Sequence, residues 1–215
     1  MSVMNRIIPL FPLQIVVFPT EVLPLHIFEE RYKQLINDCK RRGLNFGIPT
    51  FLEGKLSYGT EVKLEEIVKN YDNGSMDILC ILCKGIRTFK VDKFFNPIPN
   101  KLYAGGEVQF FENKDDSTLE EYSEVIALIK QLYAIIGVSA HNIQIETFNS
   151  FLFAHKIGMS IGEEYQLLEI VSERERVQFI KAHLLKVLPI LNQVNDTRKL
   201  IQMNGHFKNL DPLKF

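Results

Sequence analysis

The stretch Gly158-Met159-Ser160-Ile161-Gly162 matches G-x-S-x-G, the pattern in which a strained strand-to-helix turn exposes a nucleophilic serine. Such a turn needs a buried strand directly before it, whereas the residues from Phe151 onward have a helical pattern. Glu163 also follows Ser160 by three residues, which is the spacing of a helix capping box. We therefore interpret Ser160 as a helix N-cap and keep an enzyme with a serine nucleophile as an alternative hypothesis.

Cys80 and Cys83 form a C-x-x-C pair that has two possible kinds of chemistry. A structural zinc site would need two further ligands with local spacing, which the sequence does not supply. A redox pair would need a helix N-terminus to lower a thiol pKa, but this pair lies in a predicted strand, where residues three apart point to opposite faces. Together with Cys39, the count of three is odd and indicates no disulfide framework. We predict buried structural thiols.

Nothing else in the sequence forms a catalytic, metal or cofactor site. None of the 12 glycines begins the phosphate-binding pattern G-x-x-x-x-G-K-[ST], so we do not expect ATP hydrolysis. The five histidines show no metal-ligand spacing: His26, His141, His155, His183 and His206. We predict a protein that is not an enzyme and needs neither a cofactor nor a metal.

The composition argues against charged partners. The net charge is -1, from 25 basic and 26 acidic residues, so no overall field attracts nucleic acid or a membrane surface. The most apolar N-terminal run, Ile7 to Pro19, contains three prolines that would break a signal or membrane helix. We expect a cytoplasmic protein.

The predicted secondary structure changes from mainly strands to mainly helices near residue 113. Residues 1–113 are predicted to be β-rich, with a bent or edge strand within 7–18, further strands near 62–70, 76–82, 86–91 and 103–111, and a hairpin turn at Asp72-Asn73-Gly74. Gly105-Gly106 indicates a bulge. One embedded helix, Glu29 to Arg42, has apolar residues at helical spacing and stops at Gly43.

Residues 117–203 are predicted to form a helical bundle, followed by a tail at 204–215. We expect helices from Ser117 to Gly137, from Ser139 to Lys156, around 165–170, and a long one from Glu173. Three capping boxes are expected: Ser117 with Glu120, Ser160 with Glu163, and Ser172 with Glu175.

The most specific pattern lies at the N-terminus. Ile8-Pro9-Leu10-Phe11-Pro12-Leu13 and Val16-Val17-Phe18-Pro19 precede Leu23-Pro24-Leu25-His26-Ile27-Phe28-Glu29, which leads to Arg31-Tyr32. Together with Gly85-Ile86-Arg87-Thr88-Phe89 and Leu167-Leu168-Glu169, these blocks closely resemble the N-terminal domain of Lon proteases, over roughly Arg6 to Leu191. Thr20 departs from the family, which usually has Gly at this turn.

The resemblance implies an α+β fold in which a PUA-like pseudo-barrel with one embedded helix precedes a helical bundle ending in a long helix. It also implies recognition of protein or peptide segments with exposed apolar residues, as a substrate-recognition or adaptor module beside a protease or chaperone system. The residues of the signature that we expect to bind are Phe11, Phe18, His26, Phe28, Glu29, Arg31 and Tyr32. RNA binding, which PUA-like folds perform elsewhere, is the alternative function.

Overall fold

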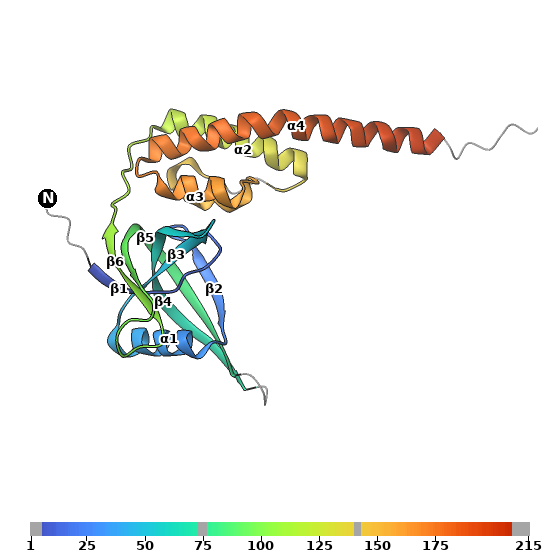
Figure 1. Ribbon diagram of the computed structural model, residues 1–215. Coiled ribbons are helices and arrows are strands. Elements are labelled where there is room, and N and C mark those ends of the chain that lie inside the picture. Colours follow the sequence, from blue (N-terminus) through green and yellow to red (C-terminus); the bar gives the residue numbers. More distant parts are fainter. Residues whose placement is uncertain (1–5, 73–76, 140–142, 208–215) are drawn as a thin grey trace, which may run out of the picture. The chain divides into compact units, whose positions relative to one another are not determined.

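Six strands and four α-helices make up most of the computed structural model, which describes residues 6–72, 77–139 and 143–207 (Figure 1). The first part of the chain contains β1 (Arg6–Leu10), β2 (Val22–Ile27), α1 (Glu30–Arg42), β3 (Phe46–Leu52), β4 (Lys55–Asp72), β5 (Asp77–Phe95) and β6 (Ala104–Phe110). The second part contains α2 (Leu119–Ile136), the 3-10 helices η1 (Ile145–Thr147), η2 (Ser150–Leu152) and η3 (Ala154–Lys156), then α3 (Ile161–Glu169) and α4 (Glu173–Phe207). The predicted α+β class is confirmed. No helix within the described ranges is long and apolar enough to cross a membrane.

The six strands form one mixed sheet in the order β2-β5-β4-β3-β1-β6. The long strand β5 pairs near its start with β2 and near its end with β6, and β6 also pairs with β1. These pairings close β1, β3, β4, β5 and β6 into a barrel and leave β2 as an attached edge strand. The predicted hairpin between β4 and β5 is present as an antiparallel pair, while its turn at 73–76 lies outside the described residues.

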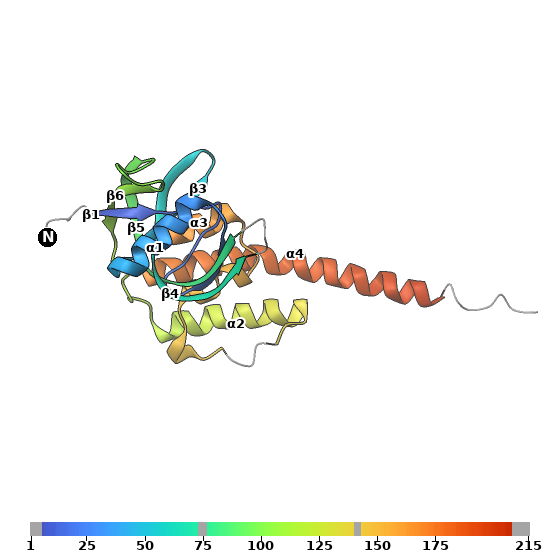
Figure 2. The same ribbon diagram turned by 90° about the horizontal axis from the view of Figure 1, so that it is seen from below.

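Helix α1 lies across one end of the barrel, as the view from below shows (Figure 2). Its apolar stripe of Tyr32, Leu35, Ile36 and Cys39 is buried, as the sequence predicted. The stripe shares a core with residues of β3, β4 and β5: Phe46, Ile48, Val62, Ile81 and Cys83. The helix ends at Gly43, whose positive φ of 62° allows its amide to donate to the carbonyl of Cys39.

Two expectations about the strands are wrong. The N-terminal strand is not an edge strand, because β1 lies between β3 and β6. Gly105 and Gly106 do not form a bulge, since they continue the regular register of β6 with β1. They are glycines for another reason: a Cβ on Gly105 would collide with the side chain of Ile98, and one on Gly106 would lie 2.7 Å from the carbonyl oxygen of Lys93.

The chain forms two compact units, and the first takes residues from both halves of the sequence. It comprises 1–116 and 149–176, while the second comprises 117–148 and 177–215. The proposed domains 1–113 and 117–203, with the tail 204–215, stay a prediction.

The predicted helix from Ser139 to Lys156 is wrong. Residues 140–142 lie outside the described residues, and the rest of the range contains the three short helices η1, η2 and η3 with non-helical residues between them. Side chains compete with a continuous helix here, because the Asn149 side chain accepts from the Phe151 amide and the Glu173 carboxylate accepts from the Ser150 amide.

The second unit contains α2 and the part of α4 after residue 176. Lys181 on α4 lies 2.6 Å from Glu124 on α2. The first capping box is shifted by one residue from its predicted place, since Thr118 and Glu121 exchange the reciprocal bonds. Ser117 donates to the Glu121 carboxylate instead, at 3.1 Å.

Candidate recognition surface

Three of the seven predicted binding residues are buried. Phe11 stacks on Tyr32 with 3.8 Å between ring centroids, inside the core under α1. Phe18 is fully buried against Phe151, at 5.2 Å between ring centroids. These three rings therefore build the fold, and of the three only Tyr32 also lines a groove that a partner could reach.

The other four predicted residues are accessible and lie where β2 leads into α1. His26 is exposed near the end of β2, and Phe28 is 61% exposed directly after it. Glu29 and Arg31 form an ion pair of 2.6 Å, and the Arg31 guanidinium lies 4.7 Å from the Tyr32 ring centroid. The signature thus combines core residues with a short accessible segment.

Strand β2 and its neighbours have two chemically distinct faces, because side chains alternate along each strand. The inner face packs into the core and comprises Leu23, Leu25, Ile27, Leu79, Ile81 and Cys83. The opposite, outer face comprises Val22, Pro24 and His26 of β2, Cys80, Leu82 and the exposed Lys84 of β5, and Phe28 at the end of the strand. Val22 is 58% exposed, although valine is normally buried.

The free edges beside this outer face are unsuited to pairing with another strand. Pro24 removes an amide donor from β2. The other free edge belongs to β4, which beyond Val62 pairs only with β5 among the described strands. The register of this pairing shifts at Glu65 and again at Val68. Prolines and bulges are devices that block edge-to-edge strand addition. A partner of this surface would therefore be held by side chains rather than by main-chain pairing.

A groove of about 270 Å³ lies at the start of α1 and includes two of the predicted residues, Arg31 and Tyr32. Its other lining residues are Pro12, Phe51, Leu56, Phe94, Asn96 and Ala104. Phe51 and Phe94 are both exposed, which is unusual for phenylalanine. Sequence reasoning missed both, because each lies in a strand whose other residues are ordinary barrel residues.

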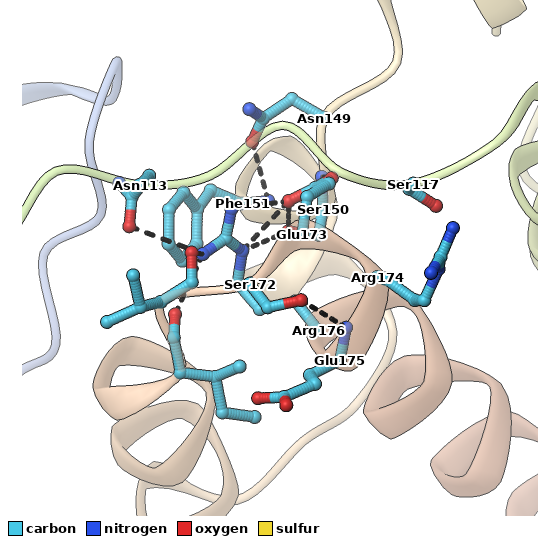
Figure 3. A network of polar contacts seen from close by, with 12 residues as sticks. Asn113, Ser117, Asn149, Ser150, Phe151, Ser172, Glu173, Arg174, Glu175 and Arg176 are labelled. Atoms are coloured by element: carbon cyan, nitrogen blue, oxygen red, sulfur yellow. Dashed lines mark hydrogen bonds and ion pairs between the residues drawn. The ribbon is translucent and has the colours of Figure 1, made fainter.

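The polar cluster of the first unit has a structural role (Figure 3). Arg176 and Glu173 are both buried, and the Glu173 carboxylate also accepts from the Ser150 hydroxyl at 2.8 Å. The Arg176 guanidinium donates to the carbonyl oxygens of Ile170 and Val171. These hydrogen bonds join the start of α4 to Ser150 and to the residues that precede the helix. The cluster therefore fixes the start of α4 within the first unit.

His155 joins two parts of the first unit. Its Nδ1 lies 2.8 Å from Glu164 and its Nε2 lies 3.3 Å from Glu21, so the ring donates at both nitrogens when it is protonated. The hydrogen bond with Glu21 is the main cause that raises the pKa of His155 to about 9, assisted by Glu164 and opposed by burial. The imidazolium therefore connects the turn before β2 to α3.

Ser160 is a helix cap. Its hydroxyl oxygen accepts from the Glu163 amide at 3.3 Å, and the Glu163 carboxylate accepts from the Ser160 amide at 2.8 Å. The short helix η3 and a turn precede it, not the strand that a nucleophile elbow requires. Within the described ranges, no group of three His, Cys, Asp or Glu residues could hold a metal ion.

The fold defines an α+β domain similar to known Lon domains. It is similar to the crystal structure of a Lon N-terminal domain protein from Xanthomonas campestris, with a TM-score of 0.65 and 27% identity, covering 82% of this chain and 98% of that one. It also shares its fold with the N-terminal domain of a Mycobacterium avium complex Lon protease, with a TM-score of 0.62 and 15% identity, covering 83% of this chain and 98% of that one.

The chain belongs to the family of the ATP-dependent protease La (LON) substrate-binding domain, whose family model matches residues 7–186. A Lon protease from Dictyoglomus thermophilum is 23% identical over 210 residues, which cover 88% of this chain and 26% of that protease. The chain therefore spans about a quarter of that relative's length. The family match is to the substrate-binding domain and not to an ATPase or peptidase domain.

Proposed function

We propose that this chain is a non-catalytic recognition module that binds protein segments with exposed apolar side chains, and that the outer face of β2 and β5 is its contact surface. The observation that carries the proposal is the exposure of Val22 and Phe28 beside Pro24 and Leu82, on strands whose opposite face is core. An apolar surface fixed on a rigid sheet can bind without first becoming ordered.

The expected affinity follows from the size of these side chains. Burying one Val or Phe side chain contributes about 1.5–3 kcal/mol, or roughly ten- to a hundredfold in a dissociation constant. Two such side chains alone therefore give weak binding, from which an unfolded segment can dissociate readily. The groove beside Phe51 and Phe94 would accept one large side chain of the same segment as an anchor.

The family supports protein segments as the bound class and proteolysis as the context, since the matched family is the substrate-binding domain of an ATP-dependent protease. We infer that the chain presents such segments to a protease or a chaperone system. Pro24 in β2 and the register shifts in β4 disfavour strand addition and so support side-chain recognition, which tolerates many sequences and suits a module that must bind diverse unfolded proteins.

Fluorescence anisotropy with a labelled, permanently unfolded protein tests the proposal. We expect saturable binding by the natural chain, and at least a tenfold weaker affinity for the double variant Val22→Ser/Phe28→Ser. Leu119→Ser is the matched control, because Leu119 is 66% exposed on α2 in the other unit. Equal losses in the two variants would overturn the assignment of the surface. Binding of structured RNA with no binding of unfolded protein would favour the alternative function.

A further inference from the structure

Cys80 and His26 form a thiol–imidazole pair within the outer face. They are cross-strand partners on β5 and β2, and the Cys80 Sγ lies 3.7 Å from the His26 Nδ1. The His26 side chain is exposed, and Cys80 is partly accessible and not in a disulfide. A nucleophile and a base are therefore in contact on a surface that reagents can reach.

The other two thiols of the chain provide an internal contrast. Cys39 and Cys83 are buried in the core under α1, and burial raises the pKa of each to about 12. Because the thiolate is the reactive form of cysteine, these two thiols should be inert in the folded chain. Cys80 differs from both in its accessibility and in its imidazole neighbour.

We propose that Cys80 is a thiol modification site, at which His26 acts as the base and a low-molecular-weight disulfide is the co-reactant. His26 Nδ1 accepts the Sγ proton in the tautomer that carries its hydrogen on Nε2. The Cys80 thiolate attacks one sulfur of the disulfide, so that a new S–S bond forms as the old one breaks. The departing thiolate takes the proton from His26, and the imidazole is restored.

The adduct changes the surface on which it forms. Cys80 lies beside Leu82 on the outer face, and Pro24 lies across the strand pair from Leu82. When the co-reactant is glutathione disulfide, the group attached to Sγ is the charged tripeptide glutathione. This tripeptide would cover the apolar side chains with polar groups. Modification therefore closes the surface to apolar segments until a thiol reductant removes the adduct. This consequence rests on the proposed function, whereas the reaction at Cys80 does not.

Mass spectrometry of the full chain incubated with glutathione disulfide tests the reaction. We expect one adduct per chain, at Cys80, and no adduct in Cys80→Ser. We expect His26→Gln to slow the adduct's formation at least fivefold at neutral pH without changing the melting temperature. Ile86→Thr, at an exposed residue of β5 outside the proposed contact surface, is the matched control and should react at the natural rate. Equal labelling of all three cysteines, or an unchanged rate in His26→Gln, would overturn the site.

Binding by the purified adduct separates the two proposals. The adduct should bind labelled unfolded protein at least tenfold more weakly than the unmodified chain, and dithiothreitol should restore the affinity. Equal affinities would overturn the regulatory consequence. If the unmodified chain binds no unfolded protein, the proposed function fails, and the labelling rates alone then decide whether Cys80 is the modification site.

Discussion

Arg176 Nη2 lies 2.6 Å from Glu173 Oε2, and both side chains are almost completely buried one turn apart at the start of α4 (Figure 3). Removing one member of such a pair leaves an uncompensated buried charge. We predict that Arg176→Met lowers the free energy of unfolding of the first unit by about 3–5 kcal/mol. Urea denaturation followed by far-UV circular dichroism measures this loss.

The double variant Glu173→Gln/Arg176→Met is the control for that measurement. It removes both charges, so it should be less destabilised than Arg176→Met alone. A single variant that loses less than about 1 kcal/mol, a value typical of an exposed ion pair, would contradict the structural role of the pair.

The His155 ion pairs predict a pH-dependent stability. Folding raises the pKa of His155 from 6.5 to about 9. The stabilisation by its ion pairs is therefore fully present below pH 6.5 and is lost as the pH rises through 9. The stability difference between the natural chain and His155→Gln should therefore shrink between pH 6.5 and 9. Thermal unfolding across this range measures the difference, and the NMR titration of the imidazole locates the midpoint. A midpoint near 6.5 would contradict the pairing with Glu21 and Glu164.

Thr20 has a positive φ of 70°, in the turn where its amide donates to the carbonyl of Gly85. A β-branched residue is strained there by about 1–2 kcal/mol, and glycine relieves this strain but loses about 0.5–1 kcal/mol through its greater freedom when unfolded. We predict that Thr20→Gly stabilises the chain by about 0.5–1 kcal/mol. Chemical denaturation tests the sign, and a destabilised variant would show that the Thr20 side chain makes a compensating contribution.

The Ser160 capping box distinguishes a structural serine from a nucleophile. Ser160→Ala should cost about 1 kcal/mol, whereas Ser160→Asp should retain most of the stability because aspartate also caps helices. Hydrogen exchange of the α3 amides measures the local effect. A hydrolase activity that is present in the natural chain and absent from both variants would contradict the interpretation of Ser160 as a cap.

Local patterns were sufficient to predict several elements. The apolar spacing of α1 and its Gly43 stop predicted that helix within one residue, and the capping box at Ser160 predicted the start of α3. These features depend on neighbours within about four residues of each other. The single-residue shift at Thr118 has the same origin, since Ser117 and Thr118 both precede a glutamate at capping distance.

Long-range pairing could not be predicted in this way. The Glu173 carboxylate that interrupts the expected helix at Ser150 is 23 residues away in the sequence. The interior place of β1 depends on its pairing with β6, which is almost 100 residues further along the chain. The buried state of Phe18 likewise depends on Phe151.

The candidate surface was predicted only in part for the same reason. The signature indicated both Phe11 and Phe28, but its spacing alone does not show which ring points into the core. The exposed phenylalanines Phe51 and Phe94 come together at the groove beside α1 only through folding. Cys80 was expected to be a buried structural thiol, whereas it is partly accessible beside His26.

The most direct test of the central claim is an NMR map of the bound state. Isotope-labelled chain would be titrated with an unstructured peptide rich in leucine and phenylalanine, and the amide shift changes would be followed residue by residue. We predict that the largest changes fall on Val22 to Phe28 and on residues 80–84, and that they are lost in Val22→Ser/Phe28→Ser. Changes confined to α2 or α4, or none at saturating peptide, would contradict the assignment of the outer face as the recognition surface.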